Sequence, residues 1–539
     1  MAKDYFQSKE FKDLLKSYEA QRGKGESIYL DADDFADLAD YYLSIDKPSL
    51  AMEVLSLGLS IHPDDEVLLI VQSASYIYQR QYDKAEEVLQ KLDADNSDVK
   101  YQLAQLEYAK YNHVPQAERI WRTWMKMENG KEPTEQQRRE SYIHIISSLI
   151  ELRGNDRGDR DYDVEAVRRW IREYIDTFQP LGKYDEDVQL ADICRDNDLA
   201  DLMSEVLVQV LEEQPYLPKG WSNLSLAQYL LQQYDQAIES SDFALAVNSN
   251  DLEALLTKAH SFHSLGEKEA ALPVFKEYLD KGGDAVQIIP YAEDLFETGQ
   301  RDVAISELEW LFNYFENRRA EAEQKYQKAK ASYTPNGKKM KAEQKLYDEI
   351  LDLYKRILTD ISDLYHHNEC YEESIAVNRR LTEVDGRDSE AYFMLGINNL
   401  ALGRYEEASR NFAFALQWAE DQVMMGVDIA LTFVLNNFDR FALEVLNAVS
   451  QIAVNSTSPF VKNIPCAKAL TYLKLGYKDQ FLSHFKVACQ ETPDLVRKVY
   501  EGYFPETAPV SQWSGYAEQN IDKLMRKFRG ENFQFQDFT

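Results

Sequence analysis

The sequence predicts an all-α protein: a right-handed α-solenoid, or superhelix, of stacked helix-turn-helix repeats with a projecting antiparallel helical hairpin. Two observations predict this fold. The 539 residues include only 21 Gly and 15 Pro, well below the roughly 12% that these helix breakers usually contribute. Similar pairs of amphipathic segments also recur about every 34 residues, which is typical of an array that grows in one dimension and not of separate globular domains.

The repeated unit is clearest near residue 400. A first helix is expected over 389–402 and a second over 405–419, with a tight turn after Gly403. Where the second helix must touch the first, small residues allow close crossing. This position is Met203, Ser374 and Phe481 in three units. In eight units it is alanine: Ala51, Ala85, Ala117, Ala237, Ala271, Ala304, Ala408 and Ala442.

The pattern resembles the tetratricopeptide repeat (TPR), whose units of about 34 residues each form a helix pair. The resemblance covers most of residues 31–500, and it implies a scaffold that binds a protein or peptide segment and that is not an enzyme. Eleven units are expected to begin near residues 32, 66, 98, 184, 218, 252, 285, 355, 389, 423 and 462.

Seven segments follow from this period. They are an N-terminal amphipathic capping helix (1–30), three TPR-like units (31–130), an irregular helix pair with a charged loop at 153–161 (131–183), four units (184–317), a long basic hairpin (318–354), four units (355–500) and a C-terminal cap and tail (501–539). The N-terminal helix and the tail, which contains Phe533, Phe535 and Phe538, are expected to cover the ends of the array. The alternative is that the N-terminal helix or the C-terminal tail occupies the groove of the array.

The hairpin reverses the charge of the chain. Residues 318–356 carry eleven Lys and Arg against six Asp and Glu, and apolar residues at heptad spacing predict an antiparallel seam. The first helix contributes Ala322, Tyr326, Ala329 and Tyr333, the turn is 334–337, and the second helix contributes Leu346, Ile350, Leu353 and Ile357. Two interpretations remain: a solvated coiled-coil face, or a docking surface for an acidic partner such as RNA through Lys338, Lys339 and Lys341.

The TPR resemblance implies a concave groove lined by the first helix of each pair. The expected peptide-binding residues are Tyr229, His260, His263, Glu293, Phe296, Asp363, His366 and Phe393, and the same face includes Lys219, Ser222, Glu253, Ile289 and Glu390. Aromatic rings beside acids favour a basic and partly apolar peptide. In the centre of the array, the Lys, Asn and Arg clamp by which chaperone-binding TPR domains hold a terminal carboxylate is missing, because Glu253 and Thr257 stand where Lys and Arg would be needed.

Composition restricts the other function classes. The net charge is −33, so binding of nucleic acid is improbable except through the hairpin. No phosphate loop, nucleophile elbow or zinc helix occurs, which predicts no enzyme activity and no cofactor; His260 and His263 as metal ligands are the less favoured alternative. No apolar run is long enough for a membrane span. Four scattered cysteines and the lack of a leader-like N-terminus predict a cytoplasmic protein of unknown oligomeric state.

Overall fold

The computed structural model describes residues 2–24, 29–126, 132–152, 163–332, 338–504 and 508–530. These residues form 28 α-helices and three short 3-10 helices, and they contain no β-strand. The charged loop 153–161, Tyr333 with the turn 334–337, and the tail phenylalanines beyond residue 530 lie outside the described residues. The chain divides into two compact units, Met1–Val274 and Phe275–Thr539, and each is treated by itself below.

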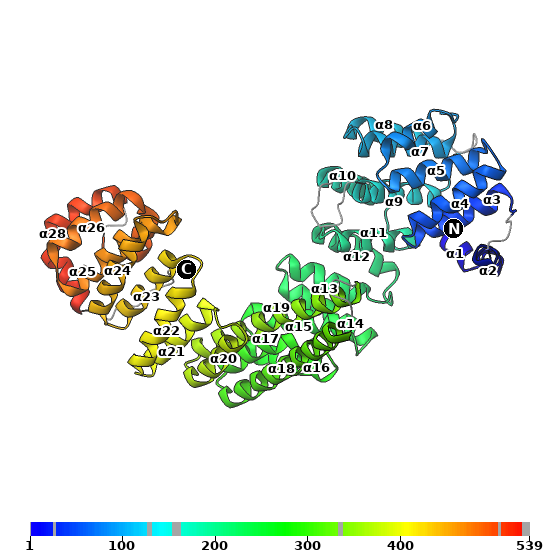
Figure 1. The fold of residues 1–539 in the computed structure, drawn as a ribbon. Coiled ribbons are helices and arrows are strands. Elements are labelled where there is room, and N and C mark those ends of the chain that lie inside the picture. Colours follow the sequence, from blue (N-terminus) through cyan, green and yellow to red (C-terminus); the bar gives the residue numbers. More distant parts are fainter. Residues whose placement is uncertain are drawn as a thin grey trace. The chain divides into compact units, whose positions relative to one another are not determined.

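The first unit consists of consecutive antiparallel helix pairs (Figure 1). Its helices are α1 (Ala2–Gln7), α2 (Lys9–Lys24), α3 (Ala32–Ser44), α4 (Pro48–Ile61), α5 (Glu66–Tyr78), α6 (Tyr82–Leu89), α7 (Ser97–Ala109), α8 (Val114–Trp124), α9 (Glu135–Glu151), α10 (Val164–Thr177), α11 (Asp185–Asp196), α12 (Ala200–Glu213), α13 (Gly220–Leu230), α14 (Tyr234–Val247) and α15 (Leu252–Leu265). The division between the units falls inside α16 (Lys268–Asp280).

The second unit continues the same pairing. It contains η1 (Ala285–Gln287), α17 (Ile288–Glu297), α18 (Arg301–Ser332), α19 (Lys338–His367), α20 (Tyr371–Val384), α21 (Ser389–Ala401), α22 (Tyr405–Trp418), α23 (Gln422–Leu435), α24 (Asp439–Ala453), η2 (Pro459–Asn463), α25 (Ile464–Leu475), α26 (Lys478–Glu491), α27 (Pro493–Val499), η3 (Val510–Gln512) and α28 (Trp513–Gly530).

The crossing position of each pair confirms the TPR-type fold that the sequence predicted. All eight predicted alanines are at most 1% exposed, as are Met203, Ser374 and Phe481. Ser374 replaces alanine for a polar reason: its hydroxyl donates to the carbonyl of Ser362 (3.0 Å) and accepts from the side chain of Asn398 (2.8 Å). We call the first helix of each pair helix A and the second helix B.

The turn from helix A to helix B repeats as regularly as the helices. In every one of the eleven pairs a residue just after helix A has a left-handed backbone: Asp46, Arg80, Asn112, Asp198, Gln232, Gly266, Gly299, Glu369, Gly403, Asn437 and Gly476. Only four of them are glycine, although this conformation costs other residues roughly 1 kcal/mol. The stacked helices on both sides therefore impose the turn even where the local sequence does not favour it.

The irregular segment of the first unit is held by a buried charge network. Arg139 on α9 is 1% exposed and donates to the carboxylate of Asp187 on α11, which is completely buried. Asp187 also accepts from the hydroxyl of Tyr174 (2.6 Å) and from the backbone N–H of Gly182 (2.8 Å). Because every partner is polar and in contact, the charge pair can remain buried between α9, α10 and α11.

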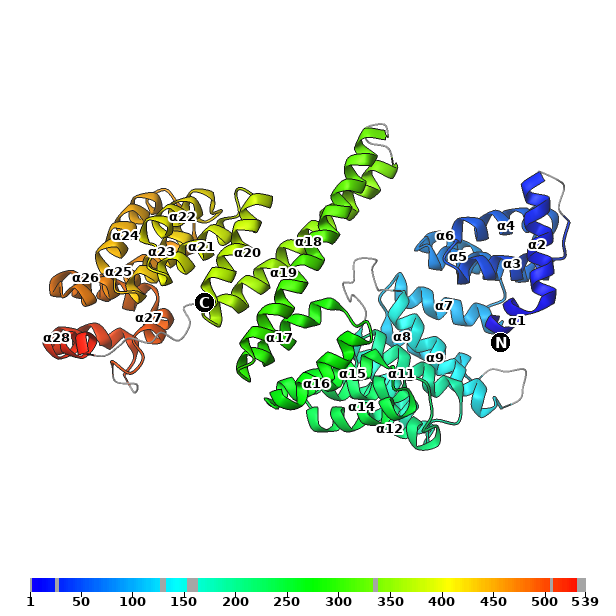
Figure 2. The ribbon, with the colours of Figure 1, turned by 90° about the horizontal axis from the view of Figure 1, so that it is seen from below.

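The hairpin is formed by α18 and α19, whose far ends run side by side beyond the neighbouring helices of the same unit (Figure 2). Ala322 and Ala329 are buried in the seam as predicted. The prediction that Leu346 lies in the seam is wrong, because Leu346 is 45% exposed. Its neighbour Tyr347 stacks on Tyr326 instead, with ring centroids 5.4 Å apart. The wide aromatic ring of Tyr326 thus selects a partner one residue further along α19.

The base of the hairpin is joined to the next helix through Glu316. Both carboxylate oxygens accept from Arg380 on α20 (2.6 and 3.1 Å), one accepts from Arg319 (2.9 Å), and the other accepts from the hydroxyl of Tyr354. Burial raises the pKa of Glu316, but these hydrogen bonds outweigh burial and lower the pKa to about 2. The contact fixes the direction in which α18 and α19 leave the repeats.

Candidate functional site

The A helices of the second unit carry five of the eight predicted groove residues. Glu293 and Phe296 lie on α17, Asp363 and His366 on α19, and Phe393 on α21. All five are half-buried. They therefore combine partial desolvation with access from solvent, as a binding surface requires.

A hollow of about 520 Å³ brings two of these residues together from different helices. Glu293 and Asp363 line it with Ile289, which is another predicted groove position, and with five residues outside the predicted groove positions. The full lining is Ile289, Glu293, Glu297, Asp360, Asp363, Leu364, His367 and Asn368. Four of these eight side chains are carboxylates, so the hollow is strongly acidic on an apolar floor of Ile289 and Leu364.

The acidic surface extends across α21 and α23. Burial raises the pKa of Asp363 and of Glu390, and the Asp363 charge contributes to the shift of Glu390. On the next A helix, burial raises the pKa of Asp428 to about 6, with further contributions from Glu390 and Asp421. Glu390 thus feels the charge of Asp363, and Asp428 feels that of Glu390, whereas His367 and His366 act to lower the pKa of Asp363. We call Asp363, Glu390 and Asp428 the acidic row.

No described lysine or arginine neutralises the acidic row. None of its three carboxylates forms an ion pair within the described ranges, whereas Glu316 and Asp187 in the same chain are each bound by arginine. Three partly desolvated negative charges that repel one another raise the free energy of the folded protein. A bound cationic group would remove that repulsion.

His366 and Phe393 complete this surface in different ways. The Nδ1 atom of His366 lies 2.8 Å from Oδ1 of the buried Asn398 on α21, which fixes the imidazole beside Asp363. The ring of Phe393 packs against Phe412 with centroids 5.9 Å apart, so one face of it is supported by the core. The surface therefore offers one oriented imidazole and a rigid aromatic ring next to the acidic row.

The other three predicted groove residues belong to the first unit. Tyr229 on α13 lies against His260 on α15, with centroids 6.2 Å apart, and Nδ1 of His263 lies 3.2 Å from the ammonium group of Lys268. The structure therefore brings Tyr229 and His260 together across adjacent A helices, while His263 contacts the start of α16.

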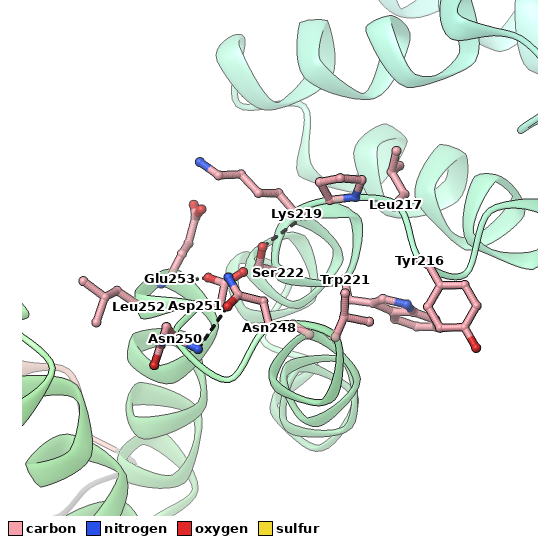
Figure 3. Close-up of a pocket in the computed structure, with 13 residues that line it drawn as sticks. Tyr216, Leu217, Lys219, Trp221, Ser222, Asn248, Asn250, Asp251, Leu252 and Glu253 are labelled. Atoms are coloured by element: carbon pink, nitrogen blue, oxygen red, sulfur yellow. Dashed lines mark hydrogen bonds between the residues drawn. The ribbon is translucent and has the colours of Figure 1, made fainter.

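A second hollow of about 610 Å³ opens at the beginning of α13 and α15 (Figure 3). It contains Lys219, Ser222 and Glu253 from the predicted groove positions, and Tyr216 and Trp221 stand at its other side. Trp221 donates from Nε1 to the carbonyl of Pro215 (2.8 Å) and stacks on Phe243. Opposite charges and the fixed ring of Trp221 give this hollow a mixed character, in contrast to the acidic row.

Among the described residues, no hairpin lysine lines the acidic hollow of the same unit. Lys339 and Lys341 are exposed in the first turn of α19, and the side chain of Lys338 lies outside the described residues. Across the described ranges, no cluster of three or more His, Cys, Asp or Glu side chains could hold a metal ion. In the same ranges, each helix is too short or too polar to span a lipid bilayer.

No protein-family model matches the chain, and no curated protein matches it. Among solved structures it is similar to YrrB, a TPR protein with an unusual peptide-binding site, at 13% identity over 41% of this chain and 96% of that one, with a TM-score of 0.29. It is also similar to a tetratricopeptide repeat protein from Parabacteroides merdae (14% identity, 53% and 98% covered, TM-score 0.31) and to the APC/C hetero-tetramer Cut9–Hcn1 (12%, 92% and 92%, TM-score 0.26). At these identities none of them transfers a residue role to this chain.

Proposed function

We propose that this chain, whose helix pairs have the tetratricopeptide architecture, is a non-enzymatic scaffold that binds a protein or peptide segment on its A helices. In the unit Phe275–Thr539 the bound segment is basic and partly apolar. The observation that carries the proposal is the acidic row, which has no cationic partner among the described residues and adjoins Phe393. All four cysteines are buried free thiols, which suits a reducing compartment, and we propose the cytoplasm.

The chemistry of the row defines the ligand. Lysine or arginine side chains would replace repulsion by attraction at Asp363, Glu390 and Asp428, while an apolar side chain beside them would cover Phe393. Because these carboxylates are partly exposed, each pair contributes only about 0.5–1 kcal/mol. Three pairs together change the dissociation constant by about tenfold or more.

The test is fluorescence anisotropy with a short fluorescein-labelled peptide of lysine and leucine. The isosteric variant D363N/E390Q/D428N should weaken binding about tenfold. The matched control E444Q/D479N/E491Q removes the same charge from exposed positions on the B helices α24 and α26, and it should bind like the unmodified protein. Equal losses in both variants would mean that total charge, not the acidic row, attracts the peptide.

A further inference from the structure

The far end of the hairpin is the most basic part of the chain. Residues 325–345 contain seven lysines and a single acidic residue, Glu343, so their net charge is +6 while the whole chain carries −33. Lys325, Lys328 and Lys341 are exposed there, and within the described residues none of them forms an ion pair. We call these three residues the lysine tip.

Folding does not explain this concentration of lysines. Lys341 lies in the first turn of α19 together with Lys338 and Lys339, and that turn contains no acidic residue. Lysines there face the positive end of the helix dipole, where cations are unfavourable and anions are favoured. A face that only needed to be solvated would gain stability from glutamate at these positions. The arrangement therefore indicates an anionic partner.

We infer that the lysine tip of one molecule docks on the acidic row of a second copy of this chain. This inference rests on the proposed function, because it names a ligand for the same groove. The two surfaces have opposite charge, and neither has an ion-pair partner in the described part of its own chain. The end of the α18–α19 hairpin, which contains these lysines, projects beyond the neighbouring helices of its unit (Figure 2), as a group that must reach another molecule would.

The arm cannot reach the acidic row of its own chain. Lys341 and Asp363 both lie on α19, which runs unbroken from Lys338 to His367. At about 1.5 Å per residue, a separation of 22 positions along the helix puts the two residues roughly 33 Å apart. Contact between them therefore requires a second molecule.

The dimensions of the two surfaces agree. The acidic row crosses three successive A helices, which at helix spacings of about 8–10 Å makes it about 20 Å long. Two packed helices of about 10 Å diameter give the hairpin a similar width. The lysine tip also lies several Debye lengths from Asp363 at physiological salt. The acidic row of the same chain therefore does not cancel the attraction between the lysine tip and the acidic row of a second molecule.

The contact joins two different surfaces and is therefore heterologous, so it generates chains or rings and not a symmetric pair. Sedimentation velocity of the full-length protein at low salt should show oligomers that dissociate as salt is added. The hairpin variant K325E/K328E/K341E and the groove variant D363N/E390Q/D428N should each be monomeric. The control K462E/K486E/K523E changes three other exposed lysines and should assemble like the unmodified protein.

Mixing the two variants provides the decisive measurement. The groove variant keeps its lysine tip and the hairpin variant keeps its acidic row, so together they should form heterodimers and nothing larger. Monomers in the mixture, or assembly of either variant alone, would overturn the inference, and so would an unmodified protein that is monomeric at low salt. Binding of polyuridylate that is lost in the hairpin variant would assign the tip to RNA instead. Peptide binding by the hairpin variant reports separately on the proposed function.

Discussion

Replacing Gly396 by alanine should destabilise the second unit, although alanine is the better helix former. A β-carbon built on Gly396 would lie 2.5 Å from Cδ1 and 2.9 Å from Cζ of Phe412. The Phe412 ring is 3% exposed and is confined by Phe393 at 5.9 Å and Phe433 at 5.2 Å between centroids. Because the ring cannot move aside, α21 and α22 must separate.

The size of the effect follows from two opposing contributions. Removing a glycine from a helix interior stabilises a protein by about 0.5–1 kcal/mol, whereas forcing an extra methyl group into a packed core costs about 1–3 kcal/mol. The expected net loss is about 1–2 kcal/mol. Gly515 provides the control: it lies in α28, and a β-carbon added there would meet no atom within 4 Å. G515A should therefore be neutral or stabilising.

Urea unfolding followed by far-ultraviolet circular dichroism measures both variants. G396A should lower the midpoint without changing the slope, because the same surface is exposed on unfolding. Shortening the obstructing ring tests the cause: in an F412L background, G396A should lose most of its cost. If G396A unfolded at the same urea concentration as G515A, the close approach of α21 and α22 would not be what requires glycine here.

Three further predictions concern charged groups. E316Q should lower the free energy of unfolding by about 2 kcal/mol at neutral pH. The pKa of Glu316 is about 2 in the folded protein, against an ordinary value of 4.5. The stability advantage of the unmodified protein should therefore disappear as the pH falls from above 4.5 toward 2. D187N removes the buried counter-ion of Arg139 and leaves only the half-exposed Glu135 (2.9 Å) paired with it, so it should cost about 3–5 kcal/mol by urea unfolding of the full chain. Since the pKa of Asp428 is raised to about 6, anisotropy should show peptide affinity falling as the pH drops through about 6, and D428N should flatten that dependence.

The repeat could be predicted from sequence because its cause is local and periodic. One small residue per unit at the crossing position determines how closely helix B approaches helix A, so Ala408 and its equivalents reveal the register without any knowledge of distant contacts. The left-handed turn was visible only where it is glycine, as at Gly403. At Glu369 and Gln232 neighbouring helices impose the same backbone, and no local signal marks it.

The features that sequence reasoning missed depend on contacts between distant segments. Arg139 and Asp187 are 48 residues apart and meet only because α9 and α11 pack together. Asp428 could have been selected from the sequence, because it is the only charged residue in the largely apolar α23. The pairing of Tyr326 with Tyr347 was missed because the apolar spacing also fits a helix face through Leu346, and only contact with the partner helix selects the face that contains Tyr347.

The contrast between paired and unpaired carboxylates within one chain bears most directly on function. At Glu316, where helices are joined, arginines bind the carboxylate and its pKa falls. At Asp363, Glu390 and Asp428 no described lysine or arginine forms an ion pair, and burial raises each pKa. The chain contains 60 lysines and arginines, so the lack of an ion pair at the acidic row among the described residues does not result from a shortage of cationic residues. Like charges held close together lower stability, and a bound cationic partner would relieve that cost. Neutralising the row should thus leave the protein at least as stable while weakening binding, the opposite of what a structural role would produce.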